Sequence, residues 1–113
     1  MQVEKQTKRG IMSVTITFVN APEELSMNLS NDNFIAFFTK LLGNAADYVG
    51  EAKALTLYNL CKNFKPKTLV QDAYAEDNYY NCGRTLEQVT RYKWALMRIA
   101  VQAMKEGKPI HWA

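Results

Sequence analysis

The chain has 113 residues, of which 48% are hydrophobic and 22% charged, a size and composition typical of one compact globular domain. No segment approaches the roughly 18 uninterrupted apolar residues of a membrane-spanning helix, and no secretory leader is evident, so we expect a cytoplasmic protein. The formal net charge is only +3, and a net +2 of it lies in the first ten residues, which argues against a nucleic-acid partner.

The N-terminal part of the chain predicts a tail and two strands. Residues 1–11 are polar and lack a period, as expected of a disordered tail or a leader, and we place a single domain at residues 12–113. From residue 12 to residue 19, Val14, Ile16 and Phe18 alternate with polar residues, which predicts a half-buried strand. A second short alternation over residues 25–29 predicts a strand antiparallel to the first.

Two helices are predicted next. Ser30 and its polar neighbours can cap a helix that ends at Leu42, and Gly43 stands where a residue with positive φ is expected. Apolar residues at three- and four-residue spacing predict a longer helix from about Ala45 to Phe64, although Gly50 weakens its first half.

The C-terminal part predicts one long helix and a last strand. Residues 68–71 match a capping box that would begin a short helix, but the same segment also fits a strand, and residues 76–84 read as a loop. A second capping box begins at Thr85 and opens a helix that runs to Glu106, before Gly107. Residues 110–112 alternate and are expected to pair with the N-terminal strand.

These elements predict an α+β fold in which a small antiparallel sheet, built from the N-terminal strands and a C-terminal strand, packs on three to four helices. On a helical wheel the apolar residues of the last helix cover an arc of about 220°. An arc of that width indicates contacts on two sides, either by the sheet and another helix or by a second subunit, and we expect self-association as a homo-oligomer.

Two segments of the predicted domain, one before its first helix and one at its C-terminal end, resemble a group of known proteins. An Asn-rich turn, Leu29-Ser30-Asn31-Asp32-Asn33, precedes an amphipathic helix, and the chain ends in Gly107-Lys108-Pro109-Ile110-His111-Trp112. This combination resembles small, mostly phage-encoded proteins of unassigned function. The resemblance implies a viral or prophage origin, hence the cytoplasm of a host cell, and it brings no catalytic residue with it.

The residues that could support catalysis or hold a metal are few. His111 is the single histidine, and its place in a short terminal strand is poorly preorganised for proton transfer. A zinc site of four Cys or His ligands is excluded within one chain, and the isolated glycines form no phosphate-binding loop. We expect free thiols at Cys61 and Cys82, no cofactor and no enzymatic activity.

Two further sets of charged residues have competing interpretations. Asp47 with Glu51, and Asp72 with Glu76, are spaced as on one helix face, which fits a solvated surface or a weak divalent-cation site. Lys93 falls inside the apolar arc of the last helix, where it must extend to solvent, pair with a carboxylate of the fold, or face a pocket or an interface.

The segment around residues 74–84 is the first choice for a partner-binding site. Tyrosine, asparagine and arginine together give large contact area and adaptable hydrogen bonds, as in many binding surfaces. The residues concerned are Tyr74, Tyr79, Tyr80, Asn81 and Arg84. The alternative is that Tyr79 and Tyr80 only close the edge of the core.

The leading hypothesis is therefore a small non-catalytic accessory protein that binds and modulates a host protein. One alternative is a protein that binds a nucleotide signal, with Lys93, Arg91 or Arg84 meeting phosphate and an aromatic residue such as Trp94 stacking on the base. A weaker alternative is nucleic-acid binding through Lys62, Lys65 and Lys67 together with Arg91, Arg98 and Lys105, which would show a steep salt dependence.

Overall fold

The computed structural model describes residues 13–44, 46–76, 79–81 and 83–113, and the predicted tail at residues 1–11 lies outside them. The described residues form an α+β fold, as predicted. The elements in chain order are β1 (Ser13–Thr17), η1 (Glu23–Leu25), β2 (Met27–Ser30), α2 (Asn31–Leu42), β3 (Gly50–Ala52), α3 (Ala54–Lys62), η2 (Pro66–Leu69), β4 (Tyr74–Glu76), β5 (Tyr79–Asn81), α4 (Leu86–Lys105) and β6 (Ile110–Trp112).

The main sheet brings both ends of the described chain together. Its strand order is β2-β1-β6-β3, and every pairing is antiparallel. The central strand β6 places Trp112 between Ile16 of β1 and Gly50 of β3. The predicted pairing of residues 110–112 with the N-terminal strand is thereby confirmed.

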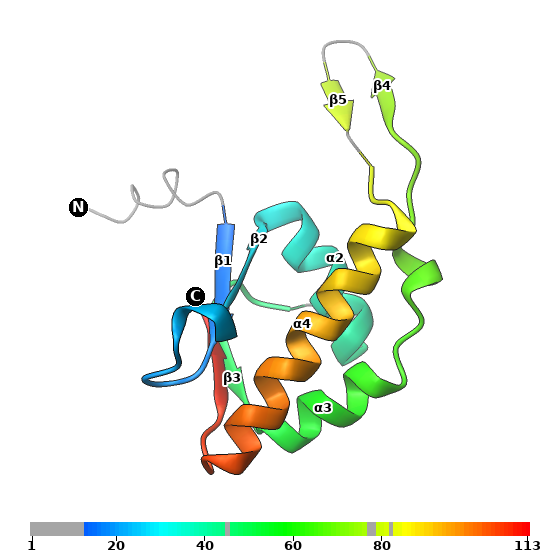
Figure 1. Ribbon diagram of the computed structural model, residues 1–113. Coiled ribbons are helices and arrows are strands. Elements are labelled where there is room, and N and C mark those ends of the chain that lie inside the picture. Colours follow the sequence, from blue (N-terminus) through cyan, green and yellow to red (C-terminus); the bar gives the residue numbers. More distant parts are fainter. Residues whose placement is uncertain (1–12, 45, 77–78, 82) are drawn as a thin grey trace, which may run out of the picture.

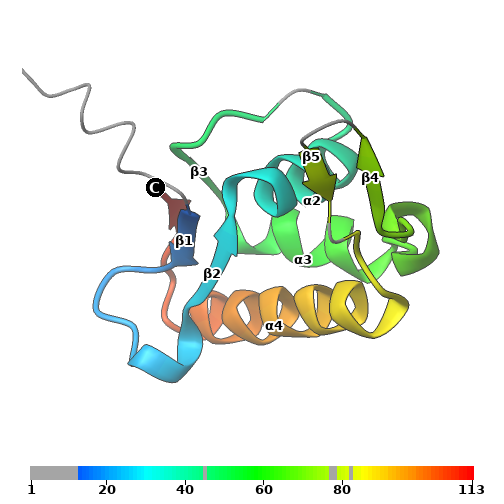
Figure 2. The ribbon, with the colours of Figure 1, turned by 90° about the horizontal axis from the view of Figure 1, so that it is seen from above.

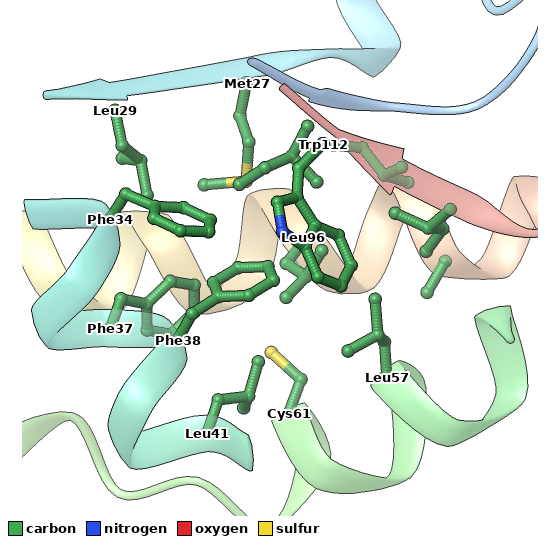
Figure 3. Close-up of a cluster of buried hydrophobic side chains, with 14 of the residues drawn as sticks. Met27, Leu29, Phe34, Phe37, Phe38, Leu41, Leu57, Cys61, Leu96 and Trp112 are labelled. Carbon is green, nitrogen blue, oxygen red and sulfur yellow. The ribbon is translucent and has the colours of Figure 1, made fainter. Parts of the chain in front are cut away.

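The helices lie on one side of this sheet, and α3 and α4 run side by side beneath it (Figures 1 and 2). The alternation within each strand sends apolar side chains toward the helices and leaves polar residues such as Thr15, Asn28 and Glu51 on the opposite face. The core between sheet and helices is rich in aromatic rings (Figure 3), with the Phe34 and Phe38 ring centroids 4.6 Å apart.

The predicted helix boundaries at capping residues are confirmed. The Ser30 hydroxyl accepts a hydrogen bond from the Asn33 amide at 3.2 Å, and Gly43 ends α2 with φ of 80°. At the start of α4, Thr85 and Gln88 form both bonds of the capping box. These ends depend on local chemistry alone, which the sequence displays directly.

The long helix predicted for residues 45–64 is wrong in its first half. Residues 50–52 form the edge strand β3, and the helix begins only at Ala54. The indole of Trp112 leaves no room for a side chain at Gly50, because an ideal Cβ at Gly50 would sit 2.5 Å from Cζ2 of the indole. Asp47 and Glu51 therefore do not share a helix face, and the cation site suggested for them loses its geometric basis.

Three other segments also differ from prediction. Leu25 belongs to the 3-10 turn η1, so β2 starts two residues later at Met27. The Thr68 hydroxyl donates to the Lys65 carbonyl at 2.8 Å and closes the 3-10 helix η2 instead of opening a helix through Gln71. The predicted loop at residues 76–84 contains β5, so Asp72 and Glu76 do not share a helix face either.

Candidate functional site

The hairpin of β4 and β5 extends away from the sheet and helices (Figure 1). Its pairing places Tyr74 opposite Asn81, Ala75 opposite Tyr80 and Glu76 opposite Tyr79. The backbone thus brings four of the five predicted partner-binding residues onto one projecting element, and Arg84 lies outside its two strands. A two-stranded hairpin with no core of its own is marginally stable in water, so its attachment to the body matters.

Arg84 attaches the base of the hairpin to the body. Its backbone exchanges two hydrogen bonds with Gln71, at 2.8 and 2.9 Å. Its guanidinium donates to the Gln71 side-chain oxygen at 2.8 Å, to the Leu69 carbonyl at 3.1 Å and to Asn33 Oδ1 at 3.2 Å. The planar five-donor guanidinium suits such a three-way contact, which links the hairpin to η2 and α2.

Gly83 completes this base. Its φ is +76°, a conformation that residues with a side chain rarely adopt, and a Cβ there would lie 2.7 Å from the Ala73 nitrogen. Residue 83 can lie this close to the backbone of residues 71–73 only because it is glycine. Sequence reasoning missed Gly83, Gln71 and Asn33 as parts of the site, although a glycine directly after a tyrosine-rich segment is a recognisable turn signal.

A second exposed feature is the outer face of α4. Trp94, near the middle of the helix, is 55% exposed, and Leu86 is 47% exposed. A hollow of about 640 Å³ runs along this face and is lined by Leu86, Glu87, Thr90, Arg91, Trp94, Ala95 and Arg98. Part of the wide apolar arc predicted for α4 is thus a strip of helix surface that the other described residues do not cover.

Lys93 is used within the fold. Its ammonium donates to the carbonyl oxygens of Phe64 at 2.9 Å and Lys62 at 3.3 Å, which lie at and just beyond the C-terminal end of α3. A cation placed there satisfies carbonyls that have no helical partner and interacts favourably with the helix dipole. The geometry supports pairing within the fold, but the partners are backbone carbonyl oxygens and not the carboxylate that the sequence suggested.

Lys93, Arg91 and Trp94, all suggested for a nucleotide ligand, do not line one cavity. Arg91 and Trp94 line the hollow on the outer face of α4, whereas Lys93 lines a separate hollow of about 440 Å³. That second hollow also contains Lys62, Lys65 and Lys67, so these lysines lie apart from Arg91 and Arg98. Among the described residues, the cations suggested for nucleic-acid binding therefore do not line one common hollow.

His111 and Cys61 lie in different parts of the fold. His111 lies between Thr17 and Glu51 on the polar face of the sheet, and Cys61 is fully buried among the helices. Burial raises the pKa of the Cys61 thiol to about 12, only partly opposed by the positive charge of Lys93. The thiol therefore stays protonated at neutral pH and is a poor nucleophile.

Cys61 is a free thiol, as predicted, and Cys82 lies outside the described residues. Within the part of the chain that the structure describes, no three His, Cys, Asp or Glu side chains gather as a metal site, and no helix has the length and apolarity needed to span a bilayer. The chain matches no protein-family model, no curated protein and no solved structure. The resemblance to phage-encoded proteins accordingly stays a prediction.

Proposed function

We propose that this chain is a small non-catalytic accessory protein that binds and modulates another protein through the β4–β5 hairpin. The observation that carries the proposal is that this hairpin projects from the body while its base is fixed by Arg84. A projecting hairpin has no core of its own to bury its side chains, and a bound partner would supply contacts that stabilise it.

The composition of the hairpin agrees with this role. Tyr74, Tyr79, Tyr80 and Asn81 provide the side-chain types that give binding surfaces large contact area at low entropic cost. A fixed base further lowers the entropic cost of binding, because the strands are presented in one orientation. The resemblance to phage-encoded proteins favours a host protein as the partner.

Binding of a nucleotide signal is supported less well. The ammonium of Lys93 already contacts two carbonyl oxygens, and it does not line the hollow that contains Arg91 and Trp94. A nucleotide bound in that hollow would have Arg91 and Arg98 for phosphate contact, and Lys93, which the hypothesis placed beside Arg91, would lie outside it.

The proposal is tested by capturing the protein from cells that contain its natural partners and comparing the wild type with the double variant Tyr79→Ala/Tyr80→Ala. The partner should be lost from the double variant, while circular dichroism and the melting temperature stay close to the wild-type values. Tyr48→Ala is the matched control, since Tyr48 is 46% exposed and lies outside the hairpin. Unchanged capture by the folded double variant would refute the assignment of the hairpin.

A further inference from the structure

We propose that the outer face of α4 binds a second copy of this chain, with the two α4 helices antiparallel about a two-fold axis. This surface is separate from the hairpin of the proposed function, and its test does not depend on that function. The proposal rests on the spacing, exposure and charges of one stripe of residues, defined as Glu87, Arg91, Trp94 and Arg98.

The stripe has the periodicity of a helix contact surface. Its members follow one another at intervals of four, three and four residues, so they lie in one row along α4. Their side chains are free of the core: Glu87 is 84% and Arg91 68% exposed, and Trp94 as a residue is 55% exposed. Thr90 and Ala95 lie beside the row in the same hollow and are small enough for a second helix to approach closely.

In an antiparallel pair of α4 helices, the charges of the stripe on one copy are complementary to those of the stripe on the other. If the two-fold axis passes between the levels of Tyr92 and Lys93, Glu87 lies opposite Arg98 of the second copy. At the same time Arg91 lies opposite Trp94 of the second copy, where a guanidinium can stack on the indole. Because the contact is symmetric, each of these pairs occurs twice.

Within the described part of a single chain, not every charged group of this stripe has an oppositely charged partner. Glu87 is 3.5 Å from Arg91 in the same helix, and among the described side chains no ion pair is formed by Arg98. A second copy brings one carboxylate to each Arg98 and leaves Arg91 for the indole. The α4 face therefore gains a partner for every charged group of the stripe.

Two other arrangements of the helices are disfavoured by charge. A parallel pair would place Arg91 against Arg91 of the second copy. An antiparallel pair with its axis two levels further along, between Trp94 and Ala95, would place Arg91 opposite Arg98 of the second copy. Since like charges held together at an interface are costly, the charges of the stripe favour the proposed register over these two.

Sedimentation equilibrium with charge reversals tests the proposal. The wild type should approach twice its 12.9 kDa mass at high concentration, and Glu87→Arg or Arg98→Glu alone should raise the dimer dissociation constant by about tenfold or more. The double variant Glu87→Arg/Arg98→Glu should restore the wild-type constant to within about threefold, because the pairs are re-formed with exchanged signs. Lys62→Glu is the control for charge change alone, as Lys62 is exposed on α3 and lies outside the stripe.

Trp94 offers a second readout. Trp112 is only 6% exposed, so a blue shift of tryptophan emission with rising concentration would report burial of Trp94, and Trp94→Phe should abolish the shift. Circular dichroism verifies that each variant is folded. A wild type that stays at 12.9 kDa at millimolar concentration, or a folded double reversal that stays monomeric while the wild type dimerises, would overturn the proposal.

Discussion

The indole of Trp112 lies against Gly50, one strand away, in space that any side chain at residue 50 would fill. An ideal Cβ at Gly50 would be 2.5 Å from Cζ2 and 2.9 Å from Nε1 of the ring. The same nitrogen donates a hydrogen bond to the Asp47 carbonyl at 3.0 Å. The C-terminal strand is thus held to the edge strand by one aromatic side chain as well as by the ladder of backbone bonds.

Gly50→Ala should lower the free energy of unfolding by about 1–3 kcal/mol, because the added methyl forces a buried ring or the edge strand to move. Urea unfolding followed by circular dichroism measures the loss. Gly107→Ala is the comparison, since Gly107 has φ of +68° but no atom within 4 Å of an added Cβ, so only backbone strain is introduced. A Gly50→Ala protein as stable as the wild type would contradict the close packing of Trp112.

Arg84→Ala should loosen the base of the hairpin. The variant loses three side-chain hydrogen bonds, and we expect a destabilisation of about 1–3 kcal/mol. Hydrogen exchange of the Gln71 amide, which bonds to the Arg84 carbonyl, should become faster. Arg84→Lys should recover only part of the loss, because an ammonium lacks the forked geometry. Wild-type exchange in Arg84→Ala would show that the guanidinium does not hold the hairpin.

Lys93→Met should destabilise the protein by about 0.5–1.5 kcal/mol, since it keeps the aliphatic stem and removes the ammonium that meets two carbonyls. The loss is read from thermal or urea unfolding. Lys65→Met is the matched control at an exposed position of the same hollow and should change stability by less than about 0.5 kcal/mol. Equal effects of the two changes would argue against a role for the Lys93 ammonium at the end of α3.

The Cys61 thiol should make stability depend on pH in the alkaline range. Its pKa rises from the ordinary value of 9.0 to about 12 on folding, so above pH 9 the unfolded chain loses the proton first. Stability from this group is full below pH 9 and falls as pH rises toward 12. In a Cys82→Ala background, Cys61→Ala should remove this part of the alkaline decline, and a thiol reagent at pH 8 should react with Cys61 only after unfolding. Rapid labelling of the folded protein would contradict the burial.

Much of the fold could be predicted because its signals are local. The capping oxygen of Ser30, the αL glycine Gly43 and the Thr85 capping box act within three or four residues of the helix ends that they define. The alternation in β1 and β6 likewise predicted two strands and their pairing. The helix ends and the strand alternation need only the residues beside them in the chain, whereas the pairing of β1 with β6 joins the two ends of the described chain.

The errors at Gly50 and Arg84 came from contacts between distant residues, whereas those at Leu25 and Thr68 came from local 3-10 turns. The edge strand at Gly50 depends on Trp112, and the helical periodicity of the residues around it could not show this. The role of Arg84 depends on Asn33, which belongs to α2. For the candidate site, sequence composition identified the tyrosine-rich segment, but it could not show that this segment is a projecting hairpin with an anchored base.

The most direct test of binding through the hairpin is native mass spectrometry of the protein captured gently from cells that contain its natural partners. We expect a defined extra mass of several kilodaltons or more, beyond any multiple of 12.9 kDa, that is present for the wild type and Tyr48→Ala and absent for Tyr79→Ala/Tyr80→Ala. An extra mass of only a few hundred daltons, or a complex that survives in the folded double variant, would contradict it.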